Sequence, residues 1–321
     1  MRRDIPPLDE VRRITQKKRD AWWTVLLVDP VATPLVRLTA MRTRITPNQI
    51  TWGAFLLGLG SAAFFALGDW QWLIAGAVVY HLSFILDCMD GKVARLTGTG
   101  SVFGAWLDFV FDRIRVMACA VALMWGQYDR TGESLYIWAA VAVVGLDTLR
   151  YINSLEIFKI RHSMRKQIKV RLKAARRAEN QAELAFMEDL LRDNPEADVE
   201  QDLQKARSEA GIPEAPEVAP VVKPQVIDLH QEFRHKFPAY LRARSFLLRH
   251  RIRTHLVSGI EFQMGVFMIG PLFDVVLPAT IVSGALLLVF ELAIIYKLLL
   301  STRDFTRTID SFEERKVVAA A

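Results

Sequence analysis

The sequence predicts an all-α integral membrane protein with six transmembrane helices, an N-terminal interfacial helix and a cytoplasmic helical insert. Two properties of its composition predict this class. Hydrophobic residues make up 52% of the 321 residues and charged residues 24%, yet the mean hydropathy is still positive, at +0.19. A soluble domain with this charge would not usually be so apolar, and spans alone would carry far fewer charges. The two kinds of residue must therefore occupy separate segments.

Six apolar stretches are candidate spans, because a helix needs roughly 20 apolar residues to cross the hydrocarbon core of a bilayer. Four of them lie at residues 50–67, 70–86, 102–125 and 135–149, and the other two share the block 256–300. That block is too long for one helix and contains Pro271 and Pro278. We therefore expect a turn at residues 274–278.

Basic residues in the short loops predict the orientation of the spans. The segment before the first span and the 87–101 loop carry Lys and Arg, whereas the loops at 68–71 and 126–134 contain only Arg130. By the positive-inside rule, both termini and the 87–101 loop are expected in the cytoplasm, on a multi-pass protein of the cell membrane. The first 20 residues lack the apolar core of a signal peptide.

The expected organisation has five parts. They are a cytoplasmic N-terminal segment (1–45), spans one to four (46–155), a charged cytoplasmic insert (156–255), spans five and six (256–302) and a cytoplasmic tail (303–321). In the first part, an apolar cluster at 22–28 is too short to span, and with the amphipathic stretch 31–41 it predicts a helix lying along the bilayer.

The insert contains three blocks of charge. Residues 159–177 and 234–253 hold nine and seven basic residues and no acid, and 179–217 hold twelve acids against three basic residues. Each basic block adjoins a span, so it either attracts anionic lipids or only satisfies the positive-inside bias. Nucleic-acid binding is a poor interpretation, because both basic blocks adjoin membrane spans. The Pro-rich stretch 211–224 predicts an irregular linker.

Four aspartates are the strongest functional signal, because they lie in or at the edge of apolar helices, where an isolated charge is costly. These motif aspartates are Asp87, Asp90, Asp108 and Asp112. The first two are spaced i,i+3 and the last two i,i+4, so each pair faces one way, and all four converge if their helices are antiparallel neighbours. Converging carboxylates repel unless a cation lies between them, and oxygen ligands suit Mg²⁺, Mn²⁺ or Ca²⁺.

Small residues and an arginine accompany the motif aspartates. The small residues, which leave room for a ligand near the backbone, are Gly91, Ala94 and Gly104. Arg95 has a guanidinium that matches phosphate geometry, and metal-bound carboxylates beside an arginine suggest phosphoryl transfer. The alternative is that the aspartates form buried ion pairs with Arg95, Arg113 and Arg115. Such pairs would need neither the glycines nor four acids on two helices.

The stretch from Asp87 to Asp112 resembles the signature of the CDP-alcohol phosphotransferase (CDP-alcohol phosphatidyltransferase) family, D-x2-D-G-x2-A-R-x8-G-x3-D-x3-D, with every fixed position present. Thr46–Thr51, which begins the first span, is similar to a recurrent family sequence, and six spans with cytoplasmic termini also resemble the family. The resemblance covers residues 20–155 well and the last two spans loosely. The insert is longer than this family leads us to expect.

The resemblance implies that CMP leaves a CDP-alcohol while a second alcohol forms a phosphodiester. It implies that Asp87, Asp90 and Asp108 bind two divalent cations, Mg²⁺ or Mn²⁺. Asp112 would share in metal binding and act as the general base on the acceptor hydroxyl. The implied donor-binding residues are Asp90, Gly91, Ala94, Arg95, Gly104 and Asp108, of which Gly91, Ala94 and Gly104 line the cytidine pocket and Arg95 holds the pyrophosphate. Family members commonly form homodimers, which we expect here too.

The acceptor is less well defined by the sequence. Arg113, Arg115 and Arg150 could hold an acceptor phosphate, and the Asp112–Arg113 pair is similar to that of family members that use inositol phosphate. Ordinary positive-inside charge is the alternative for all three and the preferred interpretation of Arg150. We expect CDP-diacylglycerol as donor and a polyol phosphate such as inositol phosphate as acceptor, with a soluble CDP-alcohol donor left open.

Two other interpretations are carried. A divalent-cation transporter would need acids spread through the bilayer midplane and a second broken helix, and Arg95 would oppose cation passage. A scaffold without activity is disfavoured by the intact motif. Three further acids within the spans are each close to a span end or an arginine, so we expect them to be structural. They are Asp147, Glu261 and Glu291.

Overall fold

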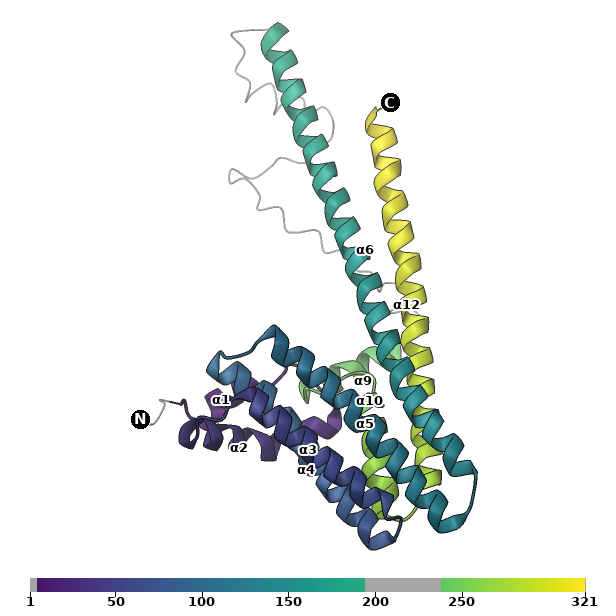
Figure 1. Ribbon diagram of the computed structural model, residues 1–321. Helices are drawn as coiled ribbons and strands as arrows, with labels where there is room; N and C mark the ends of the chain where they lie inside the picture. Colours follow the sequence, from purple (N-terminus) through teal and green to yellow (C-terminus); the bar gives the residue numbers. More distant parts are fainter. Residues whose placement is uncertain (1–4, 194–237, 321) are drawn as a thin grey trace. The chain divides into compact units, whose positions relative to one another are not determined.

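The computed structural model describes residues 5–193 and 238–320 (Figure 1). These residues are mostly helical, and their only β-type pairing is an isolated bridge between Asp20 and Ile252. The predicted helical class is thus confirmed for this part of the chain. The acidic residues 194–217 and the Pro-rich linker lie outside the described residues.

The chain forms two compact units. The first comprises Met1–Ser154 and Phe237–Ile295, and the second comprises Leu155–Lys236 and Tyr296–Ala321. Two long helices, α6 (Leu135–Asp193) and α12 (Val276–Ala320), each have residues in both units. All residues of the candidate site belong to the first unit.

The N-terminal segment contains α1 (Leu8–Thr15), a π-helical turn η1 (Thr24–Val28) and α2 (Asp29–Arg42). Helix α2 follows η1 without a break, and Pro30 lies in the first turn of α2. One face of this helix is buried, at Val28, Ala32 and Val36, while the opposite face is exposed. Its predicted position along the bilayer surface stays a prediction.

Three helices form the centre of the first unit: α3 (Pro47–Ala66), α4 (Trp70–Thr97) and α5 (Val102–Thr131). Helix α3 packs against both α4 and α5 (Figure 1). A capping box begins α3: Thr46 accepts a hydrogen bond from the Gln49 backbone N–H (3.3 Å), and the Gln49 side chain accepts one from the Thr46 N–H (2.9 Å).

The sequence predicted a loop at residues 87–101, and for most of these residues that prediction is wrong. Helix α4 continues to Thr97 and ends at Gly98, which has a φ of +67° and so takes the left-handed conformation that glycine favours. Only residues 98–101 connect the helices, and Ser101 caps α5 by accepting a hydrogen bond from the Gly104 N–H at 2.9 Å. The helical spacing of the motif aspartates therefore extends over both pairs.

The chain before α12 forms a short helical segment made of α10 (Gly259–Met264), η2 (Gly265–Ile269) and α11 (Gly270–Leu272). It ends near the predicted turn, at Asp274, which has a φ of +53°. Phe267 packs its ring against Tyr80 (4.9 Å between centroids) and Phe65 (6.4 Å). The segment is thus largely enclosed by the other helices.

Five helices in the described residues are long and apolar enough to cross a membrane. They lie at Thr24–Arg42, Pro47–Ala66, Trp70–Thr97, Leu135–Ala174 and Val276–Ser311. Helix α5 is not among them because it contains charged motif residues, but it is 30 residues long and packs along α3, so we treat it as a span. Helices long and apolar enough to span a membrane are thus present, while the count of six spans, the interfacial helix and the cytoplasmic insert stay predictions.

Candidate active site

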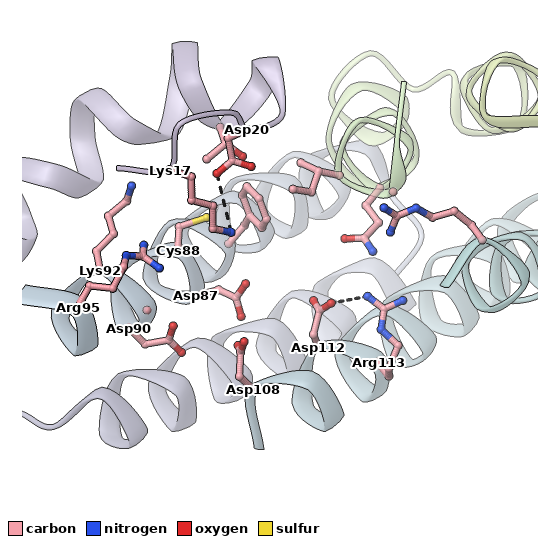
Figure 2. Close-up of a pocket in the computed structure, with 17 residues that line it drawn as sticks. Lys17, Asp20, Asp87, Cys88, Asp90, Lys92, Arg95, Asp108, Asp112 and Arg113 are labelled. Carbon is pink, nitrogen blue, oxygen red and sulfur yellow. Dashed lines mark hydrogen bonds and ion pairs between the residues drawn. The ribbon is translucent and has the colours of Figure 1, made fainter. Parts of the chain in front are cut away.

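The four motif aspartates line one pocket of the first unit (Figure 2). Asp87 and Asp90 come from α4, and Asp108 and Asp112 come from α5. In Figure 2 their carboxylates point into the same space. We call this space the acidic pocket. Its wall also includes residues from the N-terminal segment, from α6 and from α10, so parts of the chain that are far apart in sequence meet there.

A second pocket adjoins the acidic pocket, and the two share Asp90, Gly91, Arg95 and Asp108. Its wall includes the other residues that the resemblance assigns to cytidine, namely Ala94 and Gly104. A Cβ atom on Gly104 would lie 2.8 Å from Asn48 Oδ1, too close for a normal contact. Only glycine fits at this position without moving Asn48. We call the second pocket the glycine pocket.

Two residues of the glycine pocket were missed by the sequence analysis. Thr51 donates a hydrogen bond from Oγ1 to Asp90 Oδ2 at 2.6 Å, and both groups are buried. Asn48 lines the wall opposite Gly104. A signal for both existed, because they belong to the Thr46–Thr51 sequence that resembles the family, but that sequence carried no assigned role.

Arg115 lies behind the acidic pocket and does not line it. Its side chain is 2% exposed, donates to Asp112 Oδ1 (2.5 Å) and Ser83 Oγ (3.1 Å), and lies 3.4 Å from Asp87 Oδ1. It fits there because α3 has a glycine at Gly58, where a Cβ would lie 2.4 Å from the Arg115 Cδ. The arginine is thus a buried counter-charge for one aspartate from each helix.

Arg113 and Arg150 do line the acidic pocket. Arg113 forms ion pairs with Asp112 and with Asp147, which also accepts a hydrogen bond from Gln263 at 3.0 Å. Among the described residues, Arg150 has one ion pair, a distant one 4.0 Å from Glu291. Of the three arginines expected at the acceptor, two therefore face the pocket.

The further acids all have partners. Glu291 accepts a hydrogen bond from Asn153 at 2.6 Å. Glu261 accepts from the backbone N–H and the hydroxyl of Ser258, at 3.0 and 2.6 Å, and so caps α10. These contacts agree with the structural roles expected for them.

The alternative of simple ion pairs holds for only half of the aspartates. Asp87 and Asp112 pair with arginine, whereas Asp90 and Asp108 have no basic partner within 4.0 Å among the described residues. Arg95 pairs with none of the four: its Nε donates to the backbone oxygen of Thr15 at 3.0 Å. Two carboxylates therefore face the pocket without an ion-pair partner.

This ligand set fits a hard divalent cation by its chemistry, because carboxylate oxygens are the ligands that Mg²⁺ and Mn²⁺ prefer. Unpaired acids in apolar helices also need a positive charge nearby. As they stand, no three His, Cys, Asp or Glu side chains within the described ranges are close enough together to hold an ion.

Comparison with known proteins identifies the domain. Residues 44–176 match the family described as CDP-alcohol phosphatidyltransferase. The chain is 33% identical over 132 residues to a phosphatidylinositol phosphate synthase of Corynebacterium glutamicum, covering 40% of this chain and 57% of that protein. It is 42% identical over 110 residues to a bifunctional IPC transferase and DIPP synthase of Aquifex aeolicus, covering 34% and 24%.

A third relative is an archaetidylinositol phosphate synthase of Pyrococcus horikoshii, 38% identical over 86 residues, which are 26% of this chain and 44% of the relative. The chain spans about half the length of the phosphatidylinositol phosphate synthases it matches. Both pockets are lined in part by residues inside the matched region, which holds all four motif aspartates. The chain therefore contains a domain of the CDP-alcohol phosphatidyltransferase family at residues 44–176.

Proposed function

We propose that this chain transfers a phosphatidyl group from CDP-diacylglycerol to a hydroxyl of a polyol phosphate and releases CMP. The observation that carries the proposal is the pair of adjoining pockets, one lined by all four motif aspartates and the other by the small residues of the motif. The names of the relatives support inositol phosphate as the acceptor. We propose that the site faces the cytoplasm and that the chain acts as a homodimer.

In the proposed reaction, an oxygen of the acceptor hydroxyl bonds to the phosphorus that carries diacylglycerol. The bond between this phosphorus and the bridging oxygen of the diphosphate breaks, and CMP leaves with the bonding electrons. The hydroxyl proton passes to a carboxylate of the site. We assign this base role to Asp112, which lines the acidic pocket between the glycine pocket and the two pocket-facing arginines.

The surroundings of Asp112 bear on this role. Both of its oxygens accept hydrogen bonds from arginine, Oδ1 from Arg115 and Oδ2 from Arg113, and each oxygen keeps a second lone pair that can take a proton. Release of one arginine would leave more room for the acceptor hydroxyl. Arg113 is the partner that can release it at lower cost, because Arg113 keeps Asp147 as a second carboxylate. Arg115 is enclosed, and it would hold Asp112 in place.

Arg113 and Arg150 are proposed to bind the acceptor phosphate. Both line the acidic pocket, and both have a buried Nε without a hydrogen-bond partner among the described residues. Buried donors normally have a partner, and a guanidinium matches the oxygens of a phosphate. Arg115, which was expected to join them, is assigned instead to positioning the aspartates.

We propose Mg²⁺ or Mn²⁺ as cofactor, held by Asp87, Asp90, Asp108 and Asp112. When bound, the cations would neutralise the diphosphate and the charge that develops on CMP. The glycine pocket would hold the cytidine, with Gly91, Ala94 and Gly104 allowing close approach to the backbone and Arg95 binding the diphosphate. The oxygen-only ligand set and the lack of an ion-pair partner for Asp90 and Asp108 support this assignment.

The test is CMP release by the purified full-length chain in lipid nanodiscs with Mg²⁺ or Mn²⁺. CDP-diacylglycerol and soluble CDP-alcohols serve as donors, and inositol phosphate, glycerol phosphate and serine as acceptors. Asp108→Asn is the inactive variant, and Asp129→Asn is its matched control, because Asp129 is an exposed residue near the other end of the same helix.

We expect CMP only with CDP-diacylglycerol and a polyol phosphate, no CMP from Asp108→Asn, and normal release from Asp129→Asn. Release with a soluble donor alone would overturn the lipid donor but keep the reaction class. No release with any pair, together with uptake of Mn²⁺ into sealed vesicles, would overturn the enzyme and favour a cation transporter.

A further inference from the structure

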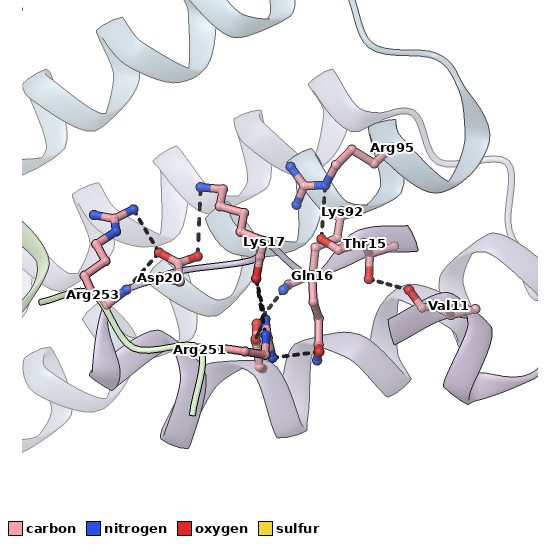
Figure 3. A network of polar contacts seen from close by, with 11 residues as sticks. Val11, Thr15, Gln16, Lys17, Asp20, Lys92, Arg95, Arg251 and Arg253 are labelled. Atoms are coloured by element: carbon pink, nitrogen blue, oxygen red, sulfur yellow. Dashed lines mark hydrogen bonds and ion pairs between the residues drawn. The ribbon is translucent and has the colours of Figure 1, made fainter. Parts of the chain in front are cut away.

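A clamp joins the N-terminal segment to the end of the charged insert (Figure 3). The backbone of Asp20 accepts a hydrogen bond from the Arg253 N–H and donates one to the Arg251 oxygen, both at 2.9 Å. The Arg251 side chain donates to the Lys17 backbone oxygen (3.0 and 3.2 Å) and to Gln16 (2.7 Å). Residues more than 230 positions apart in sequence are thus held together.

The same clamp is anchored in buried charge. Asp29 is 4% exposed and pairs with Lys92 at 2.5 Å and with Arg251 at 3.1 Å. Removing one partner from a buried set of ion pairs strongly destabilises the fold, because it leaves an unpaired charge in the interior. These ion pairs therefore fix the N-terminal segment against α4 at Lys92, which lies two residues after Asp90.

Lys17 is the residue that the clamp leaves available. Its side chain is 57% exposed and lines the acidic pocket, and in Figure 2 it lies on the side of the pocket opposite Asp108. Its ion pair with Asp20 is loose, at 4.0 Å from Oδ2. The other oxygen of Asp20, Oδ1, accepts hydrogen bonds from Arg253 at 3.0 Å and from the Ala21 N–H at 2.9 Å, so Arg253 offsets part of the charge of Asp20. The Lys17 ammonium group thus lies at the pocket without a close ion pair to Asp20.

The wall beside Lys17 also contains an unsatisfied polar group. Thr24 lines the acidic pocket, and its buried hydroxyl has no hydrogen-bond partner among the described residues. Arg95, which lines both pockets, is tied to the same N-terminal segment through its bond to the Thr15 oxygen. Lys17, Arg95 and Thr24 thus all line the acidic pocket, whose wall also carries Lys92, Arg113 and Arg150.

We infer that Lys17 binds the phosphate of the donor that carries the alcohol, and that Arg253 positions Lys17 by offsetting the charge of Asp20. This inference rests on the proposed function. Lys17 lines the acidic pocket but not the glycine pocket, so it lies beyond the nucleoside end of the donor. Arg95 lines both pockets and would contact the diphosphate from the nucleoside side. An ammonium group binds a phosphate as a compact point charge, so it can hold the phosphate while the geometry at phosphorus changes.

The experiment compares the binding of CDP and CMP to the full-length chain in nanodiscs with Mg²⁺, by calorimetry. CDP carries the second phosphate that Lys17 would contact, and CMP lacks it. We expect Lys17→Gln to weaken CDP binding about tenfold and to leave CMP binding unchanged. Lys17→Arg should restore most of the loss, and Lys18→Gln is the matched control, since Lys18 is an exposed neighbour that lines neither pocket.

The positioning role of Arg253 has its own readout. In Arg253→Gln, Asp20 loses its guanidinium partner and attracts Lys17 more strongly, which should draw Lys17 out of the pocket and lower CDP affinity by a similar factor. Adding Lys17→Gln to that variant should then have little further effect, and in turnover both single variants should raise the donor KM more than they lower kcat.

Equal CDP affinity of Lys17→Gln and the unmodified chain, or equal losses for CDP and CMP, would overturn the inference. A rise in the acceptor KM alone would also overturn it, because the phosphate bound would then be the acceptor's. If the unmodified chain bound neither CDP nor CMP, the proposed function itself would fail, and the two failures are thus distinct.

Discussion

Replacing Gly58 by alanine tests whether Arg115 positions the motif aspartates. The added Cβ would lie 2.4 Å from Arg115 Cδ, 2.6 Å from its Cγ and 3.2 Å from Ser83 Oγ. A normal contact between carbon atoms is about 3.5 Å or longer, so the stem of the arginine must move by about 1 Å. The clash falls on the middle of the side chain, whose end is held by Asp112, Asp87 and Ser83.

The magnitude follows from what this shift disturbs. Overpacking an enclosed site costs about 1–3 kcal/mol, and weakening a hydrogen bond to a charged group costs about 1.5–3 kcal/mol. We therefore expect Gly58→Ala to lower the free energy of unfolding by about 2–4 kcal/mol. Misplacing a reacting group by about 1 Å can cost a hundredfold in rate. Because Asp112 and Asp87 lose their shared anchor, we expect kcat to fall by about that factor.

The assay is CMP release from CDP-diacylglycerol, with thermal unfolding measured on the same samples. Gly60→Ala is the matched control, because it lies on the same helix and a Cβ there would meet no atom within 4 Å. It should be neutral or slightly stabilising, as alanine is the better helix former. Normal activity and stability of Gly58→Ala would refute the positioning role of Arg115.

Two further variants test the acceptor site and the base. In Gly259→Ala, the new Cβ would lie 2.4 Å from Arg150 Nη1 and displace the guanidinium, so we expect the KM for inositol phosphate to rise about tenfold. The control is Gly145→Ala, whose Cβ would meet no atom within 4 Å. Unchanged acceptor kinetics in Gly259→Ala would remove Arg150 from the acceptor site. Asp112→Asn should lower kcat by about 10²–10⁴, the usual contribution of a general base, while CDP binds within a factor of three. Turnover like that of the exposed-site variant Asp129→Asn would take Asp112 out of the base role.

Much of the site was predictable because its main groups are local in sequence. The motif aspartates lie within 26 residues, on two consecutive helices, and their i,i+3 and i,i+4 spacing determines which way each pair faces. The apolar stretches predicted at 50–67, 70–86 and 135–149 likewise fall almost wholly on the helices at Pro47–Ala66, Trp70–Thr97 and Leu135–Ala174, since a candidate span can be recognised from its composition.

The errors arose where charge was taken as a sign of a loop. Residues 87–97 contain Asp, Lys and Arg, which are typical of a membrane surface, yet they continue α4, because nothing before Gly98 breaks the helix. Charge also hid the role of Arg115. Its sequence position does not reveal that α3 offers a gap at Gly58, so an arginine expected at the acceptor is instead buried between two aspartates.

The clamp could not be predicted for a different reason. It joins Asp20 to Arg253 across 233 positions, including the charged insert, and no local pattern connects those two segments. The contribution of Lys17 to the pocket depends entirely on that long-range pairing. Only the three-dimensional arrangement reveals it.

The most direct test of the central claim is to measure CMP and lipid product together. The purified chain is given CDP-diacylglycerol, Mn²⁺ and radiolabelled inositol phosphate, and the label extracted with lipid is compared with the CMP released. The proposed transfer predicts one labelled lipid for each CMP and no product without the divalent cation. CMP release without labelled lipid, or labelled lipid formed equally well by Asp108→Asn, would contradict it.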